Sequence, residues 1–297
     1  MPRFKGPGRF RSFGFRQFSG IVWRNGGLRF KGLPGALRVH LHRPLPAEGE
    51  IKCCNCSSDV NGWFVAFVVE LPTPACVGNG RAVGIDLGIT AFAALSTGEV
   101  IPGIRAARRA EGKLKRAHRA VLRKKKGSNG REKAWRVFRR CHAEVYQQRM
   151  NHLHQASALL VRQYQIIAVE ALPLPALGAG MLRKEVRDAS WGRFISMLRY
   201  KAENAGARII AVDHRNTSQD CSGCGVRVPK TLRDRHHYCC NCGLSISRDH
   251  NAALNVLIRA GVGPGLRNAN RAVKRADGNL DESSAGTACS SHSHQFK

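Results

Sequence analysis

Four cysteines, arranged as two closely spaced pairs, carry the strongest chemical signal in the sequence. One pair is Cys221 and Cys224, and the second pair, Cys239 and Cys242, follows after 14 intervening residues. Two pairs at this spacing are typical of facing turns that hold one tetrahedral zinc ion through four thiolates. Because four protein ligands leave no open position on the metal, we expect the zinc to be structural and not catalytic.

Three carboxylates stand out from a strongly basic background. Asp86 ends an apolar segment, Glu170 ends a second one, and Asp249 opens a helical pattern. Strand ends and a helix start can meet at one point, where three carboxylates could hold two Mg²⁺ ions about 3.5–4 Å apart for phosphodiester hydrolysis. On spacing alone a simpler alternative stays open, because an acid at a helix start is commonly a cap and a strand Asp commonly forms a turn.

A weaker group of potential metal ligands lies nearer the N-terminus. The group consists of Cys53, Cys54 and Cys56, with Cys76, His40 and His42 nearby, and Cys53 and Cys56 have the spacing of half a zinc site. A matching second pair is missing from this region. We therefore interpret these cysteines as reduced thiols in a β unit, with metal binding as the less favoured alternative.

The charge of the chain indicates a polyanionic partner. Its 297 residues include 49 Lys and Arg against 20 Asp and Glu, which gives a net charge of +29. Such an excess repels itself in a compact state unless a polyanion offsets it, and nucleic acid is the obvious polyanion. The stretch 105–149 alone has 17 basic and 3 acidic residues, so we expect it to contact phosphates, with a solvated helix face as the alternative. A content of 43% hydrophobic residues argues against wholesale disorder.

Signals for export or membrane insertion are missing from the sequence. The longest clean apolar run, from Trp63 to Val69, is far too short to span a bilayer. The 11 cysteines, an odd number without an export signal, read as metal ligands or reduced thiols. We therefore expect a cytoplasmic, nucleoid-associated protein without a membrane partner.

The hydrophobic periodicity predicts an α/β layer arrangement that would position these residues. We expect apolar strands at 82–86, 89–95, 166–170 and 208–212, a further strand after a turn at 96–99, and helices at 105–125, 132–163, 191–206 and 249–260. Before them, residues 20–72 read as a small antiparallel β unit, followed by a linker rich in Pro and Gly. The sequence from Gly261 onward lacks periodicity, so we expect a disordered tail.

Five motifs follow one another in an order that resembles a known family: Val83–Ile89, Ala168–Glu170, Thr217–Gly225, Cys239–Gly243 and Ser247–Asn255. Together they resemble TnpB, a family of insertion-sequence-associated, transposase-like proteins related to the type V CRISPR effector nucleases. The resemblance implies an α/β chain whose RNase H-like (RuvC) nuclease domain is split by helical and zinc-ribbon insertions. It also implies that Asp86, Glu170 and Asp249 are catalytic carboxylates that bind Mg²⁺, and that a guide RNA from the transposon end directs cleavage of target DNA.

The resemblance also implies boundaries for the parts of the chain. The expected parts are a partial wedge-like β domain at 1–76, nuclease segments at 77–216 with a basic helical hairpin at 105–163, a zinc ribbon that binds target nucleic acid at 217–247, a final nuclease helix at 248–261 and a disordered tail at 262–297. The helical recognition lobe of the family has no counterpart here. We therefore expect an N-terminally truncated copy or a misassigned start codon.

Three other functions compete with a guided nuclease. The first is a truncated nucleic-acid-binding remnant that keeps its carboxylates but does not perform programmed cleavage. The second is a basic zinc-ribbon RNA-binding protein without nuclease ancestry, which the three carboxylates disfavour. The third is an actin-like kinase, since Gly84–Gly88 is similar to its phosphate loop, but a later Gly-rich adenosine loop is missing from the sequence and the cysteine insert disfavours it.

Overall fold

The computed structural model describes residues 10–15, 20–24, 26–32, 34–42, 44–72, 80–173, 183–231 and 233–262. Contacts within the chain divide it into two compact units, Met1–Pro74 with Arg109–Tyr146 and Ala75–Arg108 with Gln147–Lys297. The predicted disordered tail lies almost wholly outside the described residues, as does Cys76.

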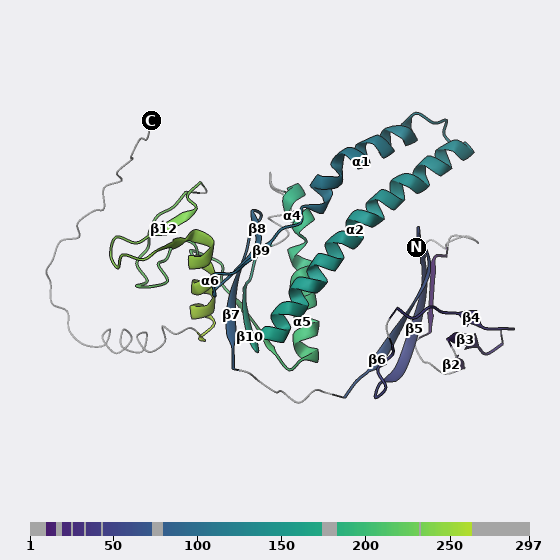
Figure 1. Ribbon diagram of the computed structural model, residues 1–297, viewed down its shortest axis with the longest axis horizontal. Helices are drawn as coiled ribbons and strands as arrows, with labels where there is room; N and C mark the ends of the chain where they lie inside the picture. The colour runs from purple at the N-terminus through teal and green to yellow at the C-terminus, as the bar shows by residue number, and fades with distance from the viewer. Residues whose placement is uncertain are drawn as a thin grey trace, which may run out of the picture. The chain divides into compact units, whose positions relative to one another are not determined.

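The second unit is built on a five-stranded mixed sheet (Figure 1). Its strands are β7 (Ala82–Leu87), β8 (Ala91–Leu95), β9 (Val100–Pro102), β10 (Ile166–Glu170) and β11 (Arg208–Val212). Their order is β11-β10-β7-β8-β9. β10 runs parallel to both β7 and β11, whereas β7, β8 and β9 form an antiparallel meander. The strands predicted by the apolar pattern are therefore present, and they join into one sheet.

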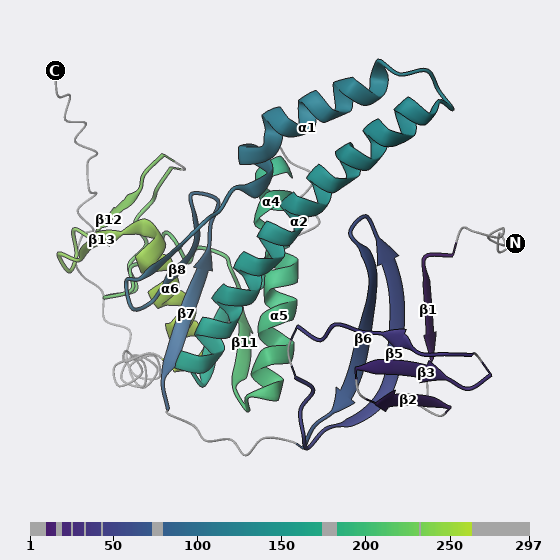
Figure 2. The ribbon, with the colours of Figure 1, turned by 45° about the vertical axis from the view of Figure 1, so that its right-hand side comes forward.

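Helices cover both faces of this sheet, as Figure 2 shows. One face packs against α5 (Trp191–Asn204) and the last part of α2 (Asn129–Gln163), through a core that includes Phe194, Leu198, Leu153 and Leu160. The opposite face is covered by α6 (Arg248–Arg259), whose Val256 packs on strand residues Ala168 and Val212. Strands that are buried on both faces have to be apolar throughout, which explains why they read as continuous hydrophobic runs.

Gly84 in β7 permits the close approach of α6 to the sheet. A Cβ atom at this position would lie 2.7 Å from the backbone nitrogen of Leu257 and closer still to the carbonyl oxygen of Ala253. Only a residue without a side chain fits there, since real Cβ contacts are longer. The glycine therefore fixes the distance between α6 and the strand that carries Asp86.

The cysteine-rich segment lies between β11 and α6. It contains a small antiparallel pair, β12 (His236–Tyr238) and β13 (Ser245–Ser247). α6 begins directly after β13, and the Ser247 side chain accepts a hydrogen bond from the backbone N–H of His250 as its N-cap. The chain thus passes from the second cysteine pair into α6 without a flexible connection.

The first unit contains two small antiparallel sheets, which confirms the β unit predicted over 20–72. β1 (Ser12–Phe15) pairs with β5 (Glu50–Asp59), which pairs with β6 (Gly62–Glu70). The second sheet consists of β2 (Ile21–Arg24), β3 (Gly27–Phe30) and β4 (Leu37–Arg38). The two sheets share one hydrophobic core, formed by Ile21, Leu28, Phe30, Cys54 and Cys56.

Two long helices carry the basic stretch. α1 (Ala106–Leu122) and α2 agree with the helices predicted at 105–125 and 132–163. Within the first unit the helices are joined side by side, because Lys113 of α1 pairs with Glu144 of α2. A short helix, α4 (Arg183–Ala189), precedes α5 and was not predicted. In the part of the chain that the structure describes, no helix is both long and apolar enough to cross a membrane.

Candidate active site and zinc-binding cluster

Asp86 and Glu170 lie side by side on neighbouring parallel strands. Ile85 of β7 is in register with Val169 of β10, so the next residues on the two strands, Asp86 and Glu170, are also neighbours. Side chains alternate between the two faces of a sheet. Because Ile85 and Val169 point into the core beneath α5, both carboxylates point to the face that α6 covers.

Asp249 enters the same region from the first turn of α6. The favourable dipole at a helix start and the cap at Ser247 hold this turn in place. Asp249 Oδ1 also accepts hydrogen bonds from the Arg248 guanidinium, with both N–O distances at 3.2 Å. The neighbouring cation offsets part of the negative charge that the three acids concentrate here.

The pKa values of both strand carboxyls are raised, and that of Asp86 indicates repulsion by its acidic neighbours. Burial raises the pKa of Asp86 well above its usual range, and the charges of Glu170 and Asp249 raise it further, while Arg248 opposes the shift. Burial likewise raises the pKa of Glu170, against a hydrogen bond from Thr217 and the charge of His214. The structure thus brings the three predicted carboxylates within electrostatic range of one another.

This oxygen-only donor set suits a hard divalent cation such as Mg²⁺. The acids are gathered less tightly than the cysteines, because the four cysteines form the one group of metal-type side chains among the described residues whose ligand atoms all lie within 4.8 Å of one another. Ligands of a two-metal site can be further apart than that, since its ions are themselves separated by about 3.5–4 Å.

The four predicted cysteines do come together. The Sγ atoms of Cys221 and Cys242 are 3.6 Å apart, and those of Cys224 and Cys239 are 3.5 Å apart. A zinc ion at about 2.3 Å from each sulfur would require sulfur–sulfur distances of about 3.8 Å, so the cluster fits a tetrahedral zinc ion. Cys240 is exposed and outside the cluster, as the choice of the outer two cysteines predicted.

The two halves of the cluster have matching turns. The N–H of Gly225 donates to the carbonyl oxygen of Cys221, and the N–H of Gly243 donates to that of Cys239, both at 2.8 Å. Both glycines have a positive φ, 80° and 72°, a conformation that side chains disfavour. These paired turns aim both sulfurs of each pair at one point.

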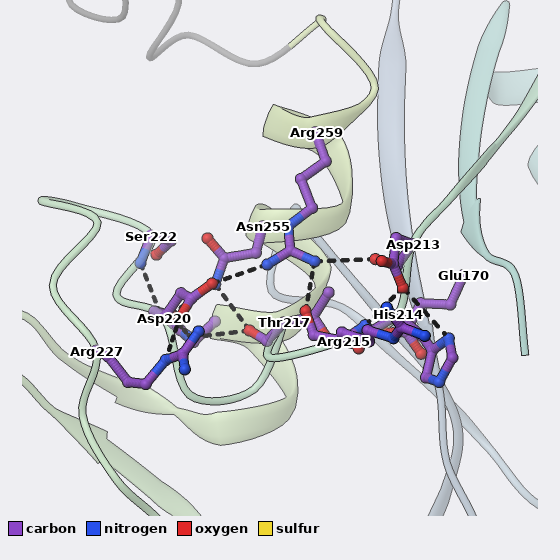
Figure 3. A network of polar contacts seen from close by, with 11 residues as sticks. Glu170, Asp213, His214, Arg215, Thr217, Asp220, Ser222, Arg227, Asn255 and Arg259 are labelled. Atoms are coloured by element: carbon purple, nitrogen blue, oxygen red, sulfur yellow. Dashed lines mark hydrogen bonds and ion pairs between the residues drawn. The ribbon is translucent and has the colours of Figure 1, made fainter. Parts of the chain in front are cut away.

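Thr217, Asn255 and Arg259 were given no individual role from the sequence. Figure 3 shows Thr217 between Glu170 and α6, with Asn255 and Arg259 reaching from that helix to the same segment. Asn and Thr in a motif carry no recognisable chemistry by themselves. Only the fold reveals that these side chains converge on the segment next to Glu170.

The weaker N-terminal group does not form a cluster of metal ligands among the residues that the structure describes. Cys54 and Cys56 lie in the core of the small sheets, and burial raises the pKa of both thiols. Cys53 is only partly buried. The interpretation as reduced thiols in a β unit accounts for these placements.

Two family models match the chain over the parts that carry the candidate sites. Residues 66–177, which include Asp86 and Glu170, match a family described as "Probable transposase". Residues 191–256, which include the four cysteines and Asp249, match the "Cas12f1-like, TNB domain".

Curated relatives cover most of the chain. A protein of Streptomyces pristinaespiralis named "Putative RNA-guided DNA endonuclease" is 37% identical over 262 residues, which are 86% of this chain and 64% of the relative. InsQ of Escherichia coli K12, which carries the same description, is 26% identical over 275 residues, or 86% of this chain and 67% of InsQ. The chain thus spans about two thirds of the length of these relatives. A solved CRISPR-Cas12f ternary complex superposes with a TM-score of 0.47 at 17% identity, over 73% of this chain and 46% of that one. By the two family models and these relatives, the chain resembles the TnpB family of transposase-like proteins.

Proposed function

We propose that this protein is an RNA-guided, Mg²⁺-dependent DNA endonuclease whose metal ligands are Asp86, Glu170 and Asp249. The observation that carries the proposal is the pair of in-register strand carboxylates beneath α6, beside the acid in the first turn of that helix. A bound divalent cation would relieve the repulsion that raises the pKa of Asp86. The names of the two relatives support the same activity.

In this proposal each carboxylate acts as a metal ligand and not as a proton acceptor. Mg²⁺ bound by these residues would supply activation of the attacking water and stabilisation of the leaving oxygen, and cleavage would then leave a 3′-hydroxyl. Asp86 and Glu170 keep a fixed separation because they are carried by hydrogen-bonded strands. Asp249 completes the ligand set from α6, and Gly84 sets how closely that helix approaches.

The proposal divides the chain as the family resemblance implies. Residues 77–216 and 248–261 would form the split RuvC-like domain, with the helical hairpin and the zinc ribbon inserted into it. The zinc held by the four cysteines would be structural, because all four of its positions are filled by protein ligands. The small sheets of the first unit would be the wedge-like domain.

Nucleic-acid contacts are assigned to the cationic surface of the hairpin and to the zinc ribbon. Trp135 and Phe138 are half-buried, and the Phe138 ring contacts the rings of Trp135, His118 and His142, so we assign both aromatic residues to helix packing and not to base stacking. The cations around them would hold a guide RNA paired with target DNA through its phosphates. The proposed partners are thus a transposon-end guide RNA and DNA of the nucleoid.

A cleavage assay on the natural complex tests the proposal. The protein is purified from cells that also carry its flanking DNA, the bound RNA is sequenced, and the complex is given a plasmid with the matching target. We expect cleavage with Mg²⁺ and its loss in Glu170→Gln, with nucleic-acid affinity unchanged. Glu203→Gln, at an exposed acid near the end of α5, is the matched control and should cut like the wild type.

Two outcomes would reject this function. Cleavage by Glu170→Gln at the wild-type rate would remove the carboxylates from the reaction. Tight RNA and DNA binding by the wild-type protein without any cleavage product would favour the nucleic-acid-binding remnant instead.

A further inference from the structure

Glu170 is held by a side chain from the start of the cysteine-rich segment. The Thr217 hydroxyl lies 2.7 Å from Glu170 Oε1, and both residues are buried, with 4% and 5% of their surface exposed. The same hydroxyl lies 3.1 Å from the carbonyl oxygen of His214. A hydroxyl has one proton to donate, and the shorter distance to a charged acceptor favours donation to Glu170. This bond occupies Oε1 and leaves Oε2 for a cation.

Two amides of α6 hold Thr217 in this position. Asn255 Nδ2 donates to the carbonyl oxygens of Thr217 and Asp220, at 2.8 and 2.7 Å (Figure 3). Asn251, one helical turn earlier, donates to the Asp220 carbonyl at 2.8 Å, and its Oδ1 accepts from the backbone N–H of Ser222 at 3.0 Å. Asn251 is fully buried and Asn255 nearly so, which makes these bonds costly to break.

Arg259 extends the same attachment to the far end of α6. Its guanidinium donates to the carbonyl oxygens of Asp213 and Arg215 and pairs with Asp220 Oδ2 at 2.8 Å. Asp220 also pairs with Arg227 in the zinc-binding segment. The helix that carries Asp249 therefore fixes the whole stretch from Asp213 to Ser222.

We propose that Thr217 is a positioning residue for Glu170, and that Asn251 and Asn255 fix it so that docking of the zinc ribbon on α6 sets the metal-binding geometry. This inference rests on the proposed function, because it assigns Glu170 to the metal site. Without the hydroxyl, the Glu170 carboxylate can rotate about its last bond and loses the orientation that points Oε2 at a cation. Outer partners of metal ligands typically contribute about 10–100-fold to metal affinity.

The proposal is tested by substitutions that separate the effect of the Thr217 hydroxyl from the effect of the side chain's shape. Thr217→Val keeps the shape and removes the donor, whereas Thr217→Ser keeps the donor. Manganese binding to the purified full-length protein, measured by calorimetry, is the first readout, with Mn²⁺ as the probe for the Mg²⁺ site. We expect about a tenfold loss of Mn²⁺ affinity in Thr217→Val and wild-type affinity in Thr217→Ser. The Mg²⁺ concentration for half-maximal cleavage should rise in the same order.

Two further variants, a control and a second test of the same contact, extend the experiment. Thr231→Val removes a surface hydroxyl of the ribbon that donates to Asp234, so it is the matched control and should bind Mn²⁺ normally. Asn255→Asp leaves the Thr217 hydroxyl in place but removes the amide donors, so it should also weaken Mn²⁺ binding. Zinc content, measured in parallel, should equal one ion per chain in every variant.

The outcomes distinguish a failure of this inference from a failure of the proposed nuclease function. If Glu170→Gln abolishes Mn²⁺ binding but Thr217→Val binds like the wild type, the positioning role is wrong and the metal site stands. If Thr217→Ser loses as much affinity as Thr217→Val, the hydroxyl is not what matters, and the inference is equally wrong. If the wild-type protein binds no Mn²⁺ that depends on Glu170, both the inference and the proposed function fail.

Discussion

In the proposed function, fold stability and metal binding place opposing requirements on Asp86. Burial and the neighbouring charges of Glu170 and Asp249 disfavour its ionised form, as its raised pKa indicates. A residue that only served folding would avoid this arrangement, whereas a metal ligand has to be ionised and desolvated. The ionised Asp86 carboxylate should therefore lower the stability of the metal-free fold by a measurable amount.

Replacing this charge should stabilise the metal-free fold. We expect Asp86→Asn to raise the thermal midpoint in Mg²⁺-free buffer at pH 7 by roughly 2–4 °C, which corresponds to about 1 kcal/mol in a domain of this size. Because the folded-state pKa is raised, the penalty is complete above that pKa and fades as the pH falls through it toward the ordinary value of 3.8. Thermal unfolding at several pH values measures this difference.

The control for this prediction is Asp59→Asn, at an exposed turn between β5 and β6 where the carboxylate accepts from the Asn61 N–H. It should not stabilise the protein. A lower midpoint for Asp86→Asn than for the wild type at pH 7 would show that Asp86 is a stabilising structural residue.

The cysteine cluster makes an independent prediction about metal content. The double variant Cys224→Ser and Cys242→Ser should lose its zinc, because a serine hydroxyl is not a thiolate ligand for zinc. Cys240→Ser, at the exposed cysteine outside the cluster, should keep it. Elemental analysis of the purified proteins decides, and full zinc content in the double variant would refute the assignment.

At the scale of the elements, the contact between α6 and β7 fixes the site, and Gly84 makes it possible. Gly84→Ala should destabilise the protein by several kcal/mol, because its Cβ would collide with the α6 backbone at Ala253 and Leu257. Urea unfolding measures the effect. Gly112→Ala in α1 is the control, since a Cβ there meets nothing within 4 Å and should stabilise the helix by about 0.5–1 kcal/mol. Equal midpoints for both variants would mean that α6 does not pack this closely.

The turn between α1 and α2 is the element whose charge is easiest to test. Reversing Lys124, Lys125 and Lys126 to Glu should make log K for duplex DNA depend less steeply on log salt, by about 0.9 units for each phosphate that the variant no longer neutralises. Lys52→Glu is the control, because that cation already pairs with Glu50 and Glu70. Titrations at several salt concentrations give the slopes, and an unchanged slope in the triple variant would identify a solvated turn.

Helices and strands could be predicted from the sequence where hydrophobic residues form a clear pattern. The helix that begins near Asp249 matches the structure because it buries a continuous apolar face, and the strand at 208–212 matches because its apolar residues pack on both sides of the sheet. α4 was missed, since it fully buries none of its residues and has only Val186 and Ala189 to pack against the core. The hydrogen bond between Thr217 and Glu170 was beyond prediction, because it joins residues 47 positions apart through a hydroxyl that could bond almost anywhere.

At the scale of the whole molecule, the site is assembled from distant parts of one chain. Asp86, Glu170 and Asp249 come from two strands and a helix, and the long hairpin and the cysteine-rich segment lie between them in sequence. Their candidacy as metal ligands came from the sequence and from the family resemblance. Their arrangement required the parallel register of β7 and β10 and the close packing of α6, neither of which the residue spacing reveals.

The central claim is that these three carboxylates form one divalent-metal site. Crystals of the full chain grown with Mn²⁺ and measured at the manganese absorption edge test it most directly, because the anomalous signal locates the ions without reference to activity. Our account predicts manganese between Asp86, Glu170 and Asp249, separate from the zinc at the four cysteines, and its loss in Asp86→Asn. An ordered site without any manganese signal, or manganese bound only elsewhere on the chain, would contradict it.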